Sequence, residues 1–106
     1  MIQRKTGGRL STVRSLKIKQ TPIFISNFNQ LKRDHRNLEL LKKVVGHLTN
    51  KDMEILARVY KDHALKGHLI HYRELHITSD WLLICKILNK ELILILTRTG
   101  SHDELL

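Results

Sequence analysis

Histidine is the residue type through which this sequence could do chemistry near neutral pH. Seven of its 106 residues are histidines. The unperturbed pKa of an imidazole is about 6.5, so a histidine can accept or donate a proton under physiological conditions. Neutral imidazole is also a common metal ligand. The sequence therefore raises two kinds of site, a metal centre and a centre of acid–base catalysis.

Four of the histidines lie between positions 63 and 76, which makes a metal centre the first hypothesis to test. They are His63, His68, His71 and His76. No framework of thiolates or carboxylates accompanies them, because the only cysteine, Cys85, lies in the middle of a predicted strand. Alternation along a strand would also point His71 and His76 to opposite faces. We therefore expect no metal site and no cofactor.

Acid–base cleavage of an RNA phosphodiester is the second hypothesis. A base must deprotonate the ribose 2′-hydroxyl, an acid must protonate the 5′-oxygen that leaves, and a cation must face the phosphoryl oxygens. Histidine suits the first two roles and arginine suits the third. Surface histidines without a catalytic role remain the alternative at this point. The side chains that would supply the parts, if the fold brings them together, are His63, His76, Asp80, Arg98 and His102.

The positive charge of the chain is concentrated in its first two fifths. Residues 1–43 carry eleven Lys/Arg and two acids, whereas residues 44–106 carry eight of each, which accounts for the whole net charge of +9. Such asymmetry favours a surface that faces a polyanion, most commonly nucleic acid. The most apolar stretch, residues 81–96, is interrupted by Lys86, Lys90 and Glu91 and is too short to span a membrane. We expect a small, soluble, cytosolic, basic protein.

Length and periodicity predict one α+β domain that would position these side chains. Residues 1–12 are predicted to be a flexible basic arm, and residues 13–106 the single domain. Strands are expected at 13–20, 69–77, 81–88 and 91–97, with a tight turn at Asn89-Lys90. Amphipathic helices are expected at 22–34 and 37–48. Residues 51–60 fit either a short helix or a packed loop. The predicted order is β-α-α-β-β-β, an antiparallel-rich sheet against two helices.

Three segments in the second half of the chain resemble the YafQ toxins, which belong to the RelE superfamily. The first, YKDHALKG at residues 60–67, is similar to the family pattern Y-K-D-H-x-L-x-G. The second, YRELHI at 72–77 followed by DWLLI at 80–84, is similar to R-[DE]-x-H-[IV]-x-P-D-W-[IL]-L-[IV]-Y. The third, RTGSHDEL at 98–105, is similar to R-[TL]-G-[ST]-H-x-x-L-F. The N-terminal strand and helices fit the family plan without a diagnostic motif.

The resemblance implies a RelE-like fold and a specific activity. Members of the family are ribosome-dependent mRNA endoribonucleases of bacterial type II toxin–antitoxin pairs. They enter the ribosomal A site and cut mRNA by 2′-hydroxyl attack, which leaves a cyclic phosphate and requires no metal. A cognate antitoxin wraps and inactivates the toxin, and the complex represses its own operon. The expected partners are thus an antitoxin, the 70S ribosome and mRNA, with operon DNA bound only through the antitoxin complex and no membrane involved.

The resemblance also assigns candidate site residues. Catalytic roles fall on His63, His76, Asp80 and His102, and substrate contacts on Lys66, Trp81, Arg98 and Leu106. Asp80 is expected to orient a histidine, with an Asx-type turn as the alternative. Trp81 is expected to pack and to shape the mRNA groove. Cys85 is interpreted as a small buried residue and not as a nucleophile.

Two departures from the family pattern bear on activity. Ser79 replaces a proline before Asp-Trp, and Leu106 replaces a terminal aromatic expected to stack on a base. A catalytically weakened homologue that acts mainly with its antitoxin as an autorepressor is therefore the second hypothesis. A non-catalytic RNA-binding module is the third.

Overall fold

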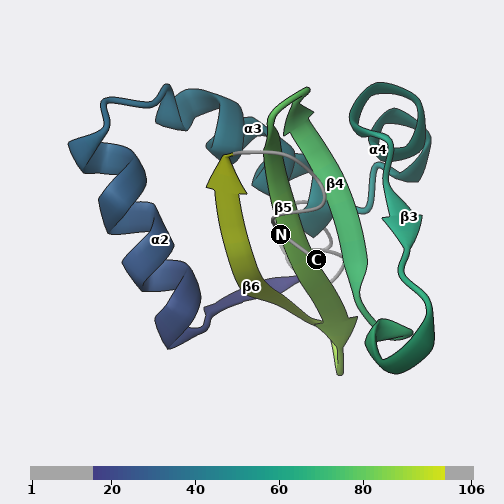
Figure 1. The fold of residues 1–106 in the computed structure, drawn as a ribbon. Coiled ribbons are helices and arrows are strands. Elements are labelled where there is room, and N and C mark those ends of the chain that lie inside the picture. Colours follow the sequence, from purple (N-terminus) through teal and green to yellow (C-terminus); the bar gives the residue numbers. More distant parts are fainter. Residues whose placement is uncertain (1–15, 100–106) are drawn as a thin grey trace, which may run out of the picture.

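The protein forms a five-stranded mixed sheet with three α-helices (Figure 1), as seen in a computed structural model that describes residues 16–99. Strand order across the sheet is β2-β6-β5-β4-β3. The elements are β2 (Lys17–Gln20), α2 (Pro22–Arg33), α3 (Leu38–Thr49), α4 (Met53–Tyr60), β3 (His63–Ala64), the 3-10 turn η1 (Gly67–Leu69), β4 (Arg73–Thr78), β5 (Trp81–Leu88) and β6 (Glu91–Thr99).

The two predicted helices begin where the sequence supplies caps. The hydroxyl of Thr21 accepts the backbone N–H of Phe24 at the start of α2, and Pro22 occupies the first turn. Asn37 accepts the N–H of Glu39 in the same way at the start of α3. Each helix presents an apolar stripe to the sheet. Within residues 16–99, no helix is long and apolar enough to cross a bilayer.

The sheet combines an antiparallel meander with one parallel edge. Strands β3, β4, β5 and β6 pair in antiparallel fashion, and β2 lies parallel to the first half of β6. The β5–β6 turn places Asn89 at φ 52° and Lys90 at φ 65°. Two consecutive left-handed residues match the twist of a two-residue hairpin, as predicted for Asn89-Lys90. The predicted fold class, an antiparallel-rich sheet packed against two helices, is confirmed.

The structure resolves one open alternative of the sequence prediction and differs from it at two strands. Residues 51–60 contain a helix, α4, whose C-terminal end is closed by Lys61 at φ 56°. The strand predicted at 69–77 begins only at Arg73, because η1 and a turn that contains His71 occupy the start of that segment. The short strand β3 was not predicted, since two residues carry no readable period.

One face of the sheet packs on α2, α3 and α4, and within residues 16–99 no helix covers the opposite face. Leu75, Ile77, Leu83 and Cys85 join the core formed with α2, α3 and α4. Because successive side chains of a strand alternate, the intervening residues of β4 project from the opposite face. That face carries Glu74 and His76, which makes it the face on which the predicted chemistry would take place.

We predict that Thr21→Val lowers the free energy of unfolding by about 1–2 kcal/mol. The Thr21 hydroxyl caps α2 and also donates to the carbonyl of Leu94 in β6, 2.9 Å away, so one group joins a helix to the sheet. Urea denaturation would measure the change. The exposed Ser26→Ala variant in the same helix is the control and should stay within about 0.5 kcal/mol of the wild type. An unchanged Thr21→Val would contradict the assigned role.

Candidate active site

His63, Glu74 and His76 form a cluster on the face of the sheet opposite α2, α3 and α4. Nε2 of His63 lies 3.2 Å from Oε1 of Glu74, and Nε2 of His76 lies 4.0 Å from the same oxygen. The two imidazole centroids are 6.4 Å apart. Cross-strand pairing of His63 with Glu74, and the i, i+2 spacing of Glu74 and His76, place all three on one side. The structure thus brings together two of the four predicted catalytic residues.

The tautomer of His63 follows from its second contact. Its Nδ1 lies 2.7 Å from the carbonyl oxygen of Lys61. A carbonyl can only accept a hydrogen bond, so Nδ1 carries a proton and donates it. Nε2, which faces Glu74, is then the nitrogen that gains or loses a proton. A carboxylate beside an imidazole is an arrangement that recurs where a histidine acts as an acid or base.

Glu74 is the buried centre of the cluster. Only 1% of its side chain is exposed, and its charge is therefore removed from water. Burying a carboxylate costs free energy unless a counter-charge or hydrogen bonds stabilise it. Ile84 of β5 pairs with Glu74, and Leu82 of β5 pairs with His76. Glu74 and His76 therefore have apolar, buried residues as their partners in β5.

A second buried carboxylate lies one residue before His63. Asp62 accepts two hydrogen bonds from Arg73, at 2.9 Å from Nε and 2.6 Å from Nη2. This pairing raises the pKa of the Arg73 guanidinium above its ordinary value, because the hydrogen-bonded carboxylate favours the charged form. Cys85 lies opposite Arg73 in the sheet, and burial, followed by the Asp62 charge, raises the pKa of its thiol to about 12.

Asp80 lies in the β4–β5 turn and interacts with a different set of residues. Its side chain is 63% exposed, accepts a hydrogen bond from the Thr78 hydroxyl at 2.9 Å, and lies 3.9 Å from Nη2 of Arg36. Arg36 in turn covers the ring of Trp81, 5.1 Å from its centroid. The carboxylate found beside the histidines is thus Glu74. Asp80, the predicted histidine partner, instead contacts Thr78 within its turn and Arg36.

Trp81 lies in the core. It is 1% exposed, and its indole N–H donates to the hydroxyl of Thr97, 2.8 Å away. The ring is thus buried against the helices, and its contact with mRNA stays a prediction. The packing half of the expectation stands, since Trp81 anchors the start of β5 directly after Asp80.

The other predicted substrate-binding residues have different placements. Lys66 is exposed beside η1, in the loop that follows β3. The backbone of Arg98 in β6 pairs with Leu82, which pairs with His76, so the three positions form one row across the sheet. His102 and Leu106 lie outside the described residues.

Glu74, Asp62 and Arg36 are the site residues that sequence reasoning did not select. Glu74 stands two positions before His76, and this strand spacing was the signal that could have revealed it. Asp62 and Arg73 are each adjacent in sequence to a member of the cluster. Strand β3, η1 and a turn separate them, so their pairing could not be predicted from the sequence. Arg36 comes from the α2–α3 connection, far from every motif, and only the tertiary fold brings it to Asp80.

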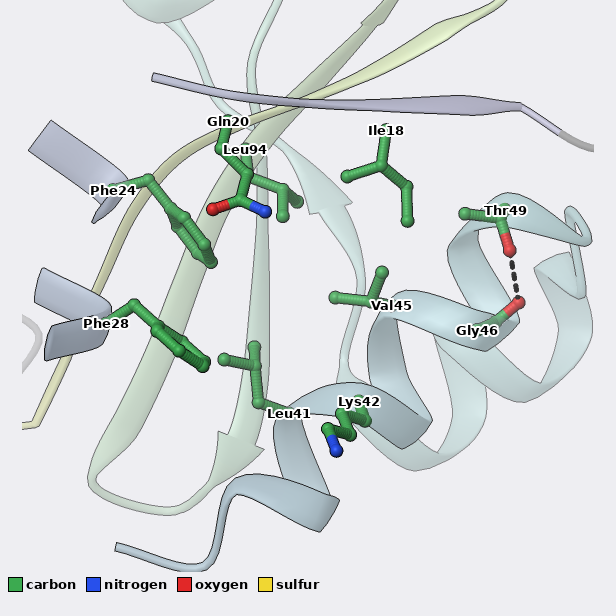
Figure 2. A pocket seen from close by; sticks show the side chains of 10 residues that line it. All are labelled: Ile18, Gln20, Phe24, Phe28, Leu41, Lys42, Val45, Gly46, Thr49 and Leu94. Carbon is green, nitrogen blue, oxygen red and sulfur yellow. Dashed lines mark hydrogen bonds between the residues drawn. The ribbon is translucent and has the colours of Figure 1, made fainter. Parts of the chain in front are cut away.

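A separate apolar groove of about 380 Å³ lies on the helical side of the molecule (Figure 2). Side chains of β2, α2, α3 and β6 line it, among them Ile18, Phe24, Phe28, Leu41, Val45 and Leu94. Of the described residues that line it, only Lys42 is ionisable. The histidine cluster, which combines titratable side chains, is therefore the candidate active site.

Comparison with known proteins identifies the family of this chain. A family model described as bacterial toxin of type II toxin–antitoxin system, YafQ, matches residues 16–106. This chain belongs to the YafQ family. It is 39% identical over 71 residues to the mRNA interferase toxin YafQ of Escherichia coli strain K12, covering 67% of this chain and 74% of that protein.

Solved structures of YafQ relatives share the fold. The crystal structure of the E. coli DinJ–YafQ toxin–antitoxin complex contains a chain with a TM-score of 0.73 and 31% identity, covering 86% of this chain and 97% of that one. A metal-bound toxin from Helicobacter pylori has a TM-score of 0.73 and 40% identity, covering 86% and 99%. Among residues 16–99 of the present chain, no three His, Cys, Asp or Glu side chains are grouped for a metal ion.

We predict that Cys85 resists alkylation in the folded protein. A pKa near 12, against 9.0 for an exposed thiol, leaves about a thousandfold less thiolate at pH 8. Iodoacetamide labelling followed by mass spectrometry would measure this, with guanidinium-unfolded protein as the reactive control. Because the unfolded thiol ionises more readily, the stability contributed by the neutral Cys85 is complete below pH 9 and declines as the pH rises towards 12. Equal labelling rates in both states would contradict the prediction.

Proposed function

We propose that this YafQ-family toxin is a ribosome-dependent mRNA endoribonuclease that uses histidine acid–base catalysis without a metal. The observation that carries the proposal is the cluster of His63, Glu74 and His76 on the face of the sheet opposite the described helices. Two imidazoles whose centroids are 6.4 Å apart can reach opposite sides of one phosphodiester. Arg98, in the same cross-strand row, is the proposed cation for the phosphoryl oxygens.

The proposed reaction is a transfer of the phosphodiester from one oxygen to another. A histidine takes the proton of the ribose 2′-hydroxyl, the O2′–P bond forms and the P–O5′ bond breaks. A second histidine protonates the departing 5′-oxygen, which leaves a cyclic phosphate and a 5′-hydroxyl end. His63 and His76 are two candidates for these roles, and His102 is a third. Lys66 and Leu106 are proposed to contact the message.

The proposed partners follow from the relatives and from the charge. The E. coli relative was solved with the antitoxin DinJ, and we propose that a cognate antitoxin binds this chain, inactivates it and represses the operon as a complex. The basic residues of α2 and α3 are proposed to meet ribosomal RNA, which places the protein in the bacterial cytoplasm. Their exposed positions support a role in binding, since they leave the core intact.

We predict that Glu74→Gln lowers the rate of mRNA cleavage on programmed ribosomes by about 10- to 100-fold while the protein stays folded. The amide keeps the shape of the side chain but removes the charge that stabilises a protonated histidine. Single-turnover cleavage with mapping of mRNA 5′ ends would measure the rate. The matched control is Glu54→Gln, a carboxylate on the surface of α4 that is 87% exposed and should leave the rate unchanged.

The outcome of the same assay separates the proposal from its alternatives. A cut that persists after the toxin is treated with chelator, with ribosomes kept in magnesium, supports metal-free chemistry. A cut that is lost on chelation and restored by zinc or copper assigns the cluster to a metal instead. A wild-type chain that binds an antitoxin but makes no cut would indicate a catalytically weakened homologue.

We predict that reversing four exposed charges on α2 and α3 weakens ribosome binding and makes it less sensitive to salt. Each lost phosphate contact removes about 0.7–0.9 from the slope of log affinity against log salt concentration. The variants are Lys32→Glu, Arg33→Glu, Lys42→Glu and Lys43→Glu. Binding to ribosomes across a salt series would measure the slope.

The control for this experiment reverses exposed basic residues outside the basic N-terminal region, at Lys51, Arg58 and Lys90. The control should bind nearly as the wild type does. Equal losses in both variants would mean that net charge alone drives binding, which would remove the specific role proposed for α2 and α3.

A further inference from the structure

The ion pair between Asp62 and Arg73 has a rigid, bidentate geometry. Both oxygens of Asp62 accept hydrogen bonds from the Arg73 guanidinium, at 2.9 and 2.6 Å, in a bidentate fork. The Asp62 side chain is only 2% exposed. Two parallel hydrogen bonds fix both the distance and the angle between the partners, which a single contact between point charges does not do.

Each partner is bonded along the chain to a member of the histidine cluster. Asp62 directly precedes His63, and Arg73 directly precedes Glu74. In the sheet, His63 pairs with Glu74 and Ala64 with Arg73. The ion pair therefore lies one residue from the contact between His63 and Glu74, on the strand pair that carries it.

The segment that holds His63 is short, and besides its pairing with β4 it is held by the backbone bond from Leu65 to Tyr72 and by the buried side chain of Leu65. Strand β3 consists of His63 and Ala64 alone, and both are exposed. It follows a helix end at which Lys61 has φ 56° and the N–H of Asp62 donates to the carbonyl of Leu56. A two-residue strand at a sheet edge is marginal without side-chain anchors, because it buries no apolar surface of its own.

We infer that the Asp62–Arg73 pair is a positioning device that holds the His63 ring against Glu74. Asp62 and Arg73 are positioning residues in this account, since neither belongs to the groups proposed to touch RNA. The inference rests on the proposed function for its catalytic consequence, but the position of the ring is a property of the free protein. With the fork in place, the Nδ1 proton of His63 remains directed at Lys61 and Nε2 remains directed at Glu74.

The test removes the fork in two ways and follows the His63 ring itself. Arg73→Lys keeps the positive charge and loses the bidentate geometry. The double variant Asp62→Leu with Arg73→Met replaces the pair by apolar side chains, a change that folded proteins often tolerate. The ¹⁵N NMR signals of the His63 imidazole report its tautomer, and single-turnover cleavage on ribosomes reports the consequence.

At a pH at which the ring is neutral, we expect the wild-type His63 to be a single tautomer with the proton on Nδ1. In both variants we expect a mixture of tautomers and a cleavage rate lower by at least about tenfold, with a cooperative unfolding transition retained. The matched control is Asp52→Asn, which breaks the contact between Asp52 and His47 at the other end of α4, 2.8 Å in the wild type. That control should leave the His63 signals and the cleavage rate unchanged.

The inference is overturned if His63 keeps its single tautomer, or its full cleavage rate, in Arg73→Lys. A variant that only loses thermal stability shows a structural role and also overturns it. If the double variant does not fold, Arg73→Lys decides the question. If wild-type protein makes no cut on ribosomes, the proposed function fails, and the NMR measurement still decides whether the pair positions His63.

Discussion

The alternation of side chains along β4 is the constraint on which the rest of the structure depends. Leu75 and Ile77 must enter the core, and Glu74 and His76 must then face the other side. A slip of one residue would place a carboxylate and an imidazole among the helices and expose two core side chains. The burial of Leu75 therefore fixes the placement of the cluster, and the same register aligns Arg98 with His76 across β5.

The sequence predicted those parts of the fold that leave a local signal. Thr21-Pro22 and Asn37 begin helices, and the left-handed pair Asn89-Lys90 closes a hairpin. Strand β3 and the fork between Asp62 and Arg73 leave no such signal, because they depend on pairing across a turn. The motifs revealed His63 and His76 through family resemblance. They did not reveal that Glu74, and not Asp80, is the carboxylate beside them, since that depends on which strand residues share a face.

The two buried carboxylates of the site act in different ways. Asp62 has a permanent cation as its partner, and its charge is compensated by a guanidinium that stays protonated at every physiological pH. Glu74 has two imidazoles, whose charge depends on whether they hold a proton. The first pair is a fixed ion pair, and the second is a contact between a carboxylate and two titratable rings. The two lie on neighbouring residues, because Asp62 precedes His63 and Arg73 precedes Glu74.

The parallel pairing of β2 with β6 joins residues 17–20 to residues 91–94, the longest sequence separation within the sheet. During translation the ribosome synthesises β3 and β4, with His63 and His76, well before β6. The central strand β5 then lacks its neighbour, and the helix α2 lacks the strand against which it packs. Contacts between segments so far apart in sequence form slowly and late. During translation there is therefore a period in which His63, Glu74 and His76 have been synthesised but β6, which completes the sheet around them, has not.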